Sequence, residues 1–273
     1  MATIRPYRPD DFSKLLNFLN SVMPGQTWTA PDLAWWLGAP GFDIARDFFV
    51  VEVSDGGEML GARDVRQAGR GDEDVPILES WGALHPVVSD TGLADTLIRK
   101  AIDRAEHVLG ERGCRQGIFQ VRCDEQDSHC RSALEAAGLR PARVLWTMIK
   151  RDLTDVQPPL FPAGFAVRCF RPGYDDRLWV DAFNDAFASH WGGWMGMSLA
   201  HWQHYQRHPA FNPGLSLVAW HGAEIAGFCH CIAVSATGAA GGSRRGMIRY
   251  VGVRPRWRGM GLGKALTQAG LVA

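Results

Sequence analysis

Apolar residues along this chain follow two periods, one of about two residues and one of about 3.6. The shorter period predicts β-strands and the longer one predicts amphipathic helices. The clearest helical pattern covers residues 92–110, where the apolar positions are Leu93, Leu97, Ala101, Ala105 and Val108. Short apolar runs bounded by Gly, Pro and Asp predict the strands.

These patterns give an alternating order of elements. In the first part of the chain we expect strands at 3–8, 47–54, 58–67, 75–85, 116–123 and 140–153, with helices at 10–23, 29–38, 92–110 and 125–137. In the second part we expect strands at 165–171, 215–220, 224–236 and 246–253, with helices at 175–188, at 198–207 and from Gly261 onward. This order predicts an α/β fold with a mixed sheet and helices on both of its faces.

The second part of the chain repeats the first. Residues 4–9 (IRPYRP) return as residues 167–172 (VRCFRP), and an acidic, helix-starting stretch follows each time. Residues 58–61 (EMLG) return as residues 224–227 (EIAG). A repeat of domain size predicts two copies of one domain, residues 1–156 and residues 165–273. The proline-rich segment at 157–164 is expected to be a stiff linker between them.

Composition narrows the possible classes of function. The chain has 29 Lys and Arg residues against 29 Asp and Glu residues, and its pI is about 7.1. This balance argues against nucleic acid or an anionic membrane as the main partner. No apolar run reaches membrane-spanning length and the start has no signal-peptide core, so we expect a cytoplasmic protein.

The six cysteines are scattered without CxxC pairs, as in a protein with reduced thiols. Cys229 and Cys231 flank His230 on an expected strand, where they face one side and the histidine the other. This arrangement favours two core thiols, and no metal site is expected.

A glycine-rich loop between the strand at 246–253 and the last helix carries the strongest chemical signal. It reads RGMGLGK from Arg258 to Lys264. Glycines let backbone N–H groups approach an anion, and the start of the next helix adds unpaired N–H groups. Ala265 after Lys264 excludes a Walker loop, and the glycine spacing excludes a dinucleotide fingerprint. The loop is therefore predicted to hold a diphosphate.

The pattern R-x-x-G-x-G, preceded by residues 251–255 (VGVRP), resembles motif A of the GNAT acyl-CoA-dependent N-acyltransferases. The order of elements resembles the GNAT fold over nearly the whole chain, and residues 183–194 and 263–267 resemble the tandem-GNAT mycothiol synthase group. The resemblance implies acetyl-CoA as co-substrate. It also implies that the backbone of the motif-A strand polarises the thioester while the loop holds the diphosphate. The implied coenzyme residues are Val251, Gly252, Val253, Arg258, Gly259, Met260, Gly261, Leu262, Gly263 and Lys264.

The resemblance also places an acceptor wall between the first two helices of the second copy. His190, Trp191 and Trp194 are the candidate substrate contacts there. The indole rings offer apolar area and the histidine offers a titratable group. Core packing of the tryptophans, and a polar helix end at His190, are the competing interpretations.

The general base is left open. GNAT enzymes often carry a glutamate on the motif-A strand, but residues 247–250 include no carboxylate. The first copy has Glu79 at the matching strand position. The candidates are therefore Glu79, His190 and Glu224, with His230 or a chain of water molecules as further alternatives.

The two copies differ at the coenzyme loop. Ser89 and Asp90 align with Arg258 and Gly259, and a carboxylate there would repel a diphosphate. The first copy is therefore expected to be a degenerate coenzyme site. The second copy lacks counterparts of the elements at 116–153 and is expected to be C-terminally incomplete. Its exposed edges predict self-association, or completion by another polypeptide, and low activity alone.

Together these features predict an N-acetyltransferase that moves an acetyl group from acetyl-CoA to a primary amine of a small molecule. Direct transfer is expected in the C-terminal domain. The alternative is a non-catalytic acyl-CoA-binding or regulatory tandem-GNAT protein, which the missing strand glutamate favours.

Overall fold

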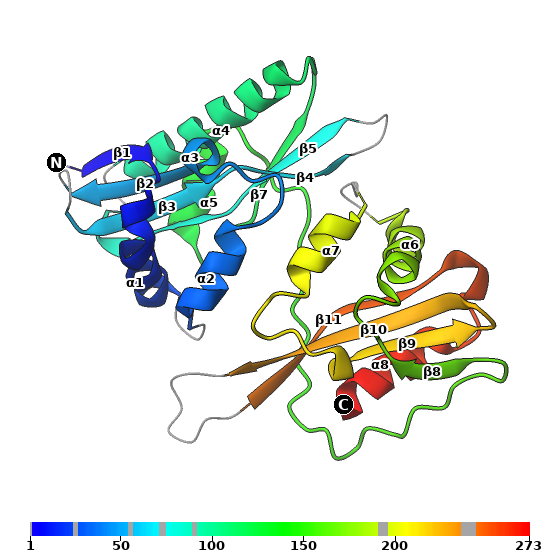
Figure 1. Ribbon diagram of the computed structural model, residues 1–273. Helices are drawn as coiled ribbons and strands as arrows, with labels where there is room; N and C mark the ends of the chain where they lie inside the picture. The colour runs from blue at the N-terminus through cyan, green and yellow to red at the C-terminus, as the bar shows by residue number, and fades with distance from the viewer. Residues whose placement is uncertain are drawn as a thin grey trace. The chain divides into compact units, whose positions relative to one another are not determined.

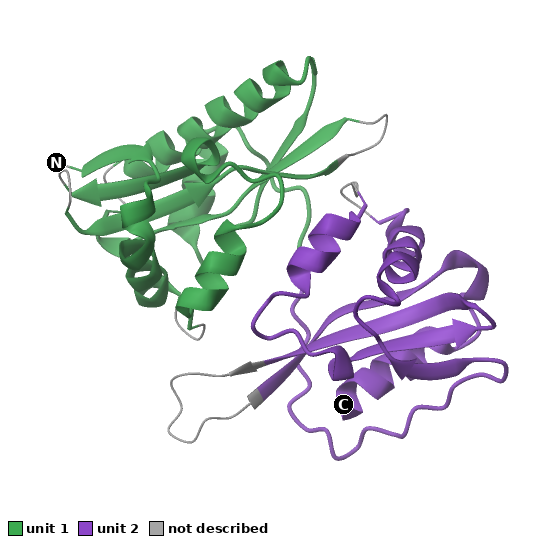
Figure 2. Cartoon of the chain, viewed as in Figure 1, with its two compact units in different colours: residues 1–145, 192–195 green, residues 146–191, 196–273 purple. Residues whose placement is uncertain are grey.

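In the computed structural model the chain forms two compact units, residues 1–145 and residues 146–191 with 196–273 (Figure 2). The structure describes residues 2–23, 27–53, 57–70, 75–88, 92–190, 196–235 and 244–273. Within these ranges no helix is long and apolar enough to cross a membrane.

The first unit contains two small sheets and five α-helices among its described residues (Figure 1). One antiparallel sheet has the order β1-β2-β3-β6, formed by Ala2–Pro6, Phe48–Val53, Met59–Asp64 and Gly82–Leu84. The other has the order β4-β5-β7, formed by Arg66–Arg70, Pro76–Ser80 and Ile118–Val121, with β5 and β7 parallel. The helices are α1 (Phe12–Val22), α2 (Ala30–Leu37), α3 (Ile44–Asp47), α4 (Leu93–Glu111) and α5 (Ser128–Ala136).

Strand β2 is buried on both faces, which explains its unbroken apolar run. Phe48 and Val50 pack in the cluster that contains apolar residues of α1 and α2. Phe49 and Val51 point the other way and pack with Leu97 of α4. The side-chain period of two thus places one helical layer on each face of this sheet.

The two long strands predicted at 58–67 and 75–85 are each broken, which is a correction to the expected single sheet. The carboxylate of Asp64 accepts a hydrogen bond from the backbone N–H of Trp81 at 2.7 Å. The N–H of Val65 donates to the carbonyl of Asp47 at 2.8 Å and so leaves the β-ladder. These two bonds interrupt both predicted strands. The first becomes β3 and β4, the second becomes β5 and β6, and the observed pairs are β3 with β6 and β4 with β5.

The strand predicted at 140–153 is wrong. These residues form no regular element, and Trp146 and Met148 are 79% and 93% exposed. Their apolar pattern resembles that of a strand, but a strand also needs a ladder partner. Among the described residues β7 pairs only with β5 and forms the edge of its sheet.

The second unit is a four-stranded antiparallel sheet covered on both faces (Figure 1). Its order is β11-β10-β9-β8, formed by Arg244–Val253, Glu224–Ser235, Ser216–His221 and Ala166–Cys169. Helices α6 (Asp176–Phe187) and α7 (Leu199–Tyr205) precede the longest strands, and α8 (Leu262–Val272) follows β11. The apolar clusters show that α6 and α7 cover one face and α8 the other.

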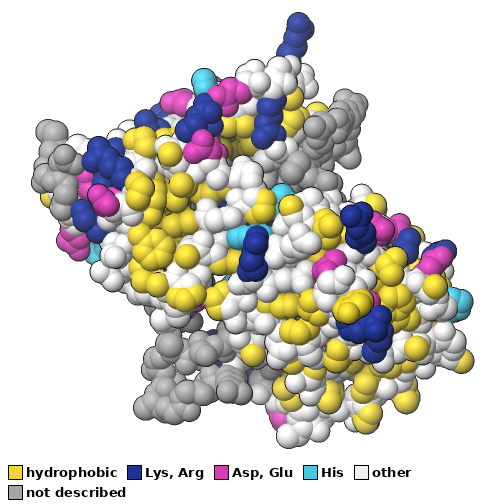
Figure 3. Space-filling model, viewed as in Figure 1, with side chains coloured by type: hydrophobic (Ala, Val, Ile, Leu, Met, Phe, Trp, Pro, Cys, Tyr) yellow, Lys and Arg dark blue, Asp and Glu magenta, His cyan; other side chains and the backbone are white. Residues whose placement is uncertain are grey.

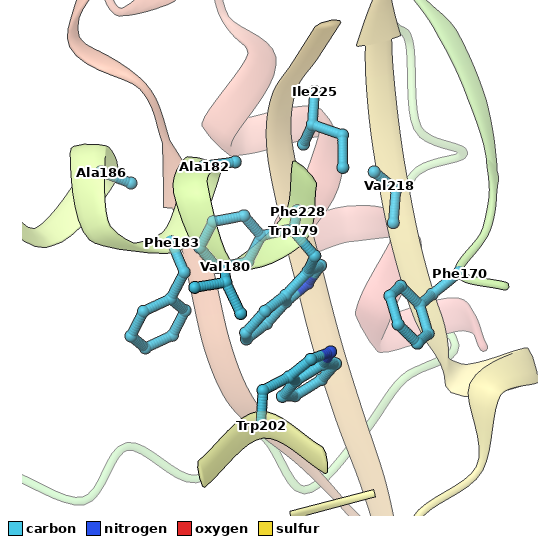
Figure 4. Packing of buried hydrophobic residues seen from close by; sticks show 10 residues of the cluster. All are labelled: Phe170, Trp179, Val180, Ala182, Phe183, Ala186, Trp202, Val218, Ile225 and Phe228. Atoms are coloured by element: carbon cyan, nitrogen blue, oxygen red, sulfur yellow. The ribbon is translucent and has the colours of Figure 1, made fainter. Parts of the chain in front are cut away.

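Aromatic rings fill the core between the sheet and α6 and α7 (Figure 4). Trp179 of α6 and Trp202 of α7 stack with ring centroids 3.6 Å apart and planes at 11°. Phe228 of β10 lies against Trp179 at 5.2 Å between centroids. Large flat side chains on all three elements therefore fix how both helices lie on the sheet.

The two faces of strand β10 carry different kinds of side chain, aromatic rings on one and cysteines on the other. Phe228 packs in the cluster with α6 and α7, and the His230 ring lies 6.0 Å from Trp202. Cys229 and Cys231 face α8, with their sulfur atoms 3.7 Å apart. The predicted separation of the histidine from the two core thiols agrees with this packing. Gly270 of α8 permits it, because a β-carbon there would lie 2.5 Å from Sγ of Cys229.

The repeated hexamer has the same structural role in each unit. Arg5 Nη1 contacts the carboxylate of Asp11 at 2.7 Å, and Arg168 Nη1 contacts Asp175 at 2.6 Å. Each buried carboxylate also accepts a backbone N–H that lies before the first helix, from Arg8 at 2.7 Å and Arg171 at 2.8 Å. The repeat therefore encodes a junction between the first strand and the first helix.

Candidate functional site

The predicted diphosphate loop joins β11 to α8 through a 3₁₀ turn, Pro255–Trp257. Gly259 and Gly261 have φ values of 77° and 85°, in the left-handed region that favours glycine. The first intrahelical bond runs from Ala265 N–H to the carbonyl of Gly261 at 3.1 Å. The N–H groups that precede Ala265 in the helix therefore have no carbonyl one turn back. They form the positive end of α8 beside an exposed loop.

Arg258 braces this loop. Its Nε donates to the carbonyl of Val253 at 3.1 Å, and Nη2 donates to the carbonyl of Ala186 at 2.8 Å. The guanidinium thus joins the loop to β11 and to the end of α6. Lys264 is exposed on the first turn of α8. These bonds hold the positive charge of Arg258 beside the loop, and its contact with a diphosphate stays a prediction.

Strand β11 contains a β-bulge just before the predicted thioester-binding stretch. The register pairs His230 with Tyr250 but Cys231 with Ile248, so Arg249 is the extra residue. Bulges redirect a strand and are frequent beside active sites. After the bulge, Gly252 packs under Phe228, and a β-carbon on it would lie 2.5 Å from Cζ of that ring. The bulge could not be predicted from the sequence, because the register depends on the partner strand.

The corresponding turn of the first unit opens α4 in the same way. Gly92 is its N-cap with φ 72°, and Thr96 N–H donates to the carbonyl of Gly92 at 3.2 Å. Ser89 and Asp90 lie outside the described residues. The proposed repulsion between Asp90 and a diphosphate stays a prediction.

The structure does not bring the proposed catalytic residues of the second unit together. Glu224 is half-exposed at the start of β10 and forms ion pairs with Arg256 and, at 4.0 Å, with Arg254. It lies about 20 Å along the strand from His230, at roughly 3.3 Å per residue. His190 is exposed beyond the end of α6, with its ring 5.7 Å from Phe187.

The remaining candidates lie elsewhere. Trp191 and Trp194 are outside the described residues. Glu79 belongs to the first unit, on β5, where it pairs in register with Arg66 and Gln120. Burial raises the pKa of its carboxyl above the ordinary value, while the nearby Arg122 opposes this shift.

His230 is the most completely buried titratable group near the bulge. It is 0% exposed, and its Nδ1 contacts the hydroxyl of Ser216. Its Nε2 has no hydrogen-bond partner within the described part of the chain. Burial lowers the pKa of His230 to about 4, with smaller effects from Arg249 and His208. The imidazole is therefore neutral at pH 7.

Four aromatic rings surround this imidazole. The centroid distances from His230 are 5.2 Å to Tyr205, 5.4 Å to Phe211, 6.0 Å to Trp202 and 6.4 Å to Tyr250. Burial, together with the neighbouring Tyr250, raises the pKa of Tyr205. Tyr205 is therefore uncharged at neutral pH. This cluster could not be predicted from the sequence, because its members come from α7, β10, β11 and the segment after α7.

Comparison with known protein families gives a match over the second unit. Residues 172–272 match the model of the Acetyltransferase (GNAT) family. The mycothiol acetyltransferase of Catenulispora acidiphila is 40% identical over 135 residues, which cover 49% of this chain and 42% of that protein. The mycothiol acetyltransferase of Thermobispora bispora is 36% identical over 191 residues, which cover 69% of this chain and 60% of that protein. The chain thus spans about half the length of the curated relatives it matches.

Solved structures extend the likeness to both units. A GCN5-related N-acetyltransferase from Sphaerobacter thermophilus has a TM-score of 0.70 at 24% identity, over 98% of this chain and 81% of that one. Saccharomyces cerevisiae N-myristoyltransferase with bound myristoyl-CoA has a TM-score of 0.59 at 12% identity, over 92% of this chain and 63% of that one. At such identities the likeness concerns the fold alone. The predicted GNAT fold is confirmed.

Proposed function

We propose that residues 172–272, which match the Acetyltransferase (GNAT) family model, transfer an acetyl group from acetyl-CoA to a primary amine of a small molecule. The observation that carries the proposal is the exposed loop with two left-handed glycines at the start of α8, directly after a bulged strand. The similarity to mycothiol acetyltransferases supports an amine acceptor.

The loop has the shape and charge that the diphosphate of acetyl-CoA requires. A β-carbon at Gly259 or Gly261 would meet no atom within 4 Å, so the space in front of both glycines is open. The free N–H groups of the first turn of α8 and the exposed Lys264 present positive charge there. Arg258 holds the loop in place through its two carbonyl bonds.

Bound acetyl-CoA supplies the activated acetyl thioester. The backbone of residues 251–253 follows the bulge and would polarise the thioester carbonyl. Orientation of the two reactants and a group that accepts the proton of the amine complete the requirements of the reaction.

The division of labour between the two units is part of this proposal. We assign acetyl transfer to residues 165–273 and a supporting role, with a degenerate coenzyme site, to residues 1–156, joined by the linker at 157–164. Self-association of the chain belongs to the same proposal. The exposed apolar residues of 144–149 offer a surface for it.

The direct test is release of free CoA thiol from acetyl-CoA in the presence of a panel of primary amines. The panel includes the acceptor of the mycothiol acetyltransferases. We expect thiol release that depends on the amine and yields the N-acetyl product. Tight acetyl-CoA binding with no acetylated amine would instead favour the non-catalytic acyl-CoA-binding alternative.

A further inference from the structure

We propose that the acceptor carries an anionic group next to its amino nitrogen, as an α-amino acid does. In this arrangement Arg249 binds the anion and Nε2 of His230 binds the amine. The inference rests on the acetyl transfer proposed above and specifies the class of acceptor.

The first observation is the unsatisfied nitrogen of His230. Its side chain is fully buried, and Nδ1 is engaged with Ser216 while Nε2 has no partner in the described residues. Buried polar atoms without a partner are rare because they lose the hydrogen bonds that water would give. When Nδ1–H donates to the Ser216 hydroxyl, Nε2 is left with a free lone pair. An N–H group of a ligand satisfies that lone pair.

The second observation is the character of the surrounding groups. Tyr205, Phe211 and Tyr250 are half-buried, and their rings lie within 6.4 Å of the imidazole by centroid. Aromatic faces attract an ammonium group. Among the described residues, the titratable groups that shift the pKa of His230 or Tyr205 are Tyr250, His208 and Arg249. None of these three supplies a carboxylate to hold an amine.

The third observation is Arg249, the bulged residue of β11. Its side chain is exposed and forms no ion pair with a carboxylate among the described residues, and its guanidinium carbon lies 5.8 Å from the Tyr250 ring. Arg249 directly follows Ile248, the residue that aligns with Glu79 of the first copy. Strand β11 therefore carries a positive charge next to the position where the first copy has a carboxylate. A plain ammonium ion would be repelled by this cation.

An acceptor that carries both groups resolves the conflict. Arg249 is the bulged residue beside Tyr250, the cross-strand partner of His230. Its positive charge acts to lower the pKa of both His230 and Tyr205, so the guanidinium lies on the same side of the sheet as these two side chains. A carboxylate beside the amine can therefore bind the guanidinium while the amine reaches Nε2. Arginine suits a carboxylate because its fork of N–H donors matches the two oxygens.

The proton balance fits this geometry. The amine nitrogen forms a bond to the acetyl carbon as the carbon–sulfur bond of the thioester breaks. The ammonium gives up two protons in becoming an amide. One passes through Nε2 of His230 to solvent, and the other ends on the CoA thiolate.

The test compares matched acceptors on the 273-residue chain. L-Leucine and glycine are each paired with their amides, L-leucinamide and glycinamide, and kcat/KM is measured by CoA thiol release. We expect the wild type to favour the acids by at least about 10-fold, the effect of one good charge-assisted contact. Arg249→Ala should remove this preference by raising KM for the acids, and Arg249→Lys should restore part of it. Arg245→Ala, an exposed arginine on the same strand, is the matched control and should keep the preference.

The imidazole is tested separately. His230→Gln should lower kcat for acids and amides alike without changing KM for acetyl-CoA, and circular dichroism reports whether the variant is folded. If that variant does not fold, Ser216→Ala, which keeps the imidazole but frees Nδ1, should lower kcat in the same way. Unchanged kcat in the folded variant would overturn the role of His230.

Two further outcomes are decisive for the acceptor class. Equal acetylation of acids and amides by the wild type would overturn the inference and leave the proposed acetyl transfer intact. If no amine is acetylated, the proposed function fails, and calorimetry of leucine against leucinamide in the presence of CoA decides the inference. Tighter binding of leucine that Arg249→Ala abolishes would support it, and equal or absent binding would overturn it.

Discussion

Single residues around the glycine-rich loop at 258–264 and the strand before it are closely packed, and glycines occupy the tightest places. Gly252 lies under Phe228, and Gly270 lies on the sulfur atoms of Cys229 and Cys231. The loop glycines could be predicted from the sequence because left-handed turns require them. The requirement for glycine at positions 252 and 270 could not be predicted, because it depends on contacts with atoms of other elements.

Gly252→Ala should destabilise the second unit. The added β-carbon would lie 2.5 Å from Cζ of Phe228, so the ring or the strand must move. Overpacking of this kind costs about 1–3 kcal/mol. Denaturant unfolding measures the loss. Gly246→Ala on the same strand, where a β-carbon meets no atom within 4 Å, is the control and should be close to neutral.

Gly261→Asp should weaken coenzyme binding far more than Gly261→Asn. Both residues tolerate the left-handed conformation of this N-cap, so the pair isolates the effect of charge. A carboxylate before α8 repels a diphosphate, and we expect at least about a 10-fold further loss of affinity. Calorimetric titration with acetyl-CoA is the measurement. Equal affinity of the two variants would show that the diphosphate binds elsewhere.

His230 should make stability depend on pH. Its folded pKa of about 4 lies below the ordinary 6.5, so between these values the unfolded chain binds more protons. Its contribution is complete above pH 6.5 and is lost as the pH falls through 4, by about 3 kcal/mol in total. Unfolding free energies from pH 7.5 to 4 should therefore fall less steeply in His230→Gln than in the wild type. His190→Gln, at an exposed site, should keep the wild-type slope.

At the scale of elements, the apolar patterns predicted correctly those elements whose hydrogen bonds form between residues close in sequence. The helix predicted at 92–110 is observed as Leu93–Glu111, and the junction encoded by the repeated hexamer forms in both units. The errors involve pairing between strands. The bulge at Arg249, the break at Val65 and the absence of a strand at 140–153 are all set by hydrogen-bond partners distant in sequence.

The strand–helix junction of the second unit should be a sensitive point. Asp175 is 1% exposed and binds both the Arg168 guanidinium and the Arg171 N–H. Asp175→Asn removes the charge that balances the partly exposed Arg168 and weakens two hydrogen bonds, and it should cost about 1–3 kcal/mol. Asp181→Asn, an exposed carboxylate on α6, the helix that Asp175 precedes, should cost less than about 0.5 kcal/mol. Similar unfolding midpoints for both variants would contradict this account.

At the scale of the whole molecule, the chain has two similar units, and we expect them to differ in how well each binds a coenzyme. On the face shown in Figure 3, basic and acidic side chains are interspersed, in keeping with the formal charge of zero. The charges on this face therefore do not mark a binding site for an anion. The expected diphosphate site depends on the local geometry of the loop at 258–264. Gly92 and Gly261 open their helices alike, but the sequence has Ser89 and Asp90 where the second loop has Arg258 and Gly259.

The full chain should therefore bind one equivalent of acetyl-CoA with high affinity. Gly92→Asp should leave this stoichiometry and affinity unchanged, whereas Gly261→Asp should abolish high-affinity binding of acetyl-CoA. Equilibrium dialysis with radiolabelled acetyl-CoA gives the number directly. Two equivalent sites, or loss of binding in Gly92→Asp, would assign a working coenzyme site to the first unit.

The stacked indoles of Trp179 and Trp202 give the second unit an optical signature. Two parallel indole rings with centroids 3.6 Å apart couple their electronic transitions, and such coupling splits a circular dichroism band into a pair of opposite sign. The pair exists only when α6 and α7 are both docked on the sheet. The amplitude of that split band therefore reports whether α6 and α7 stay packed on the sheet while a ligand is titrated. No added label is needed.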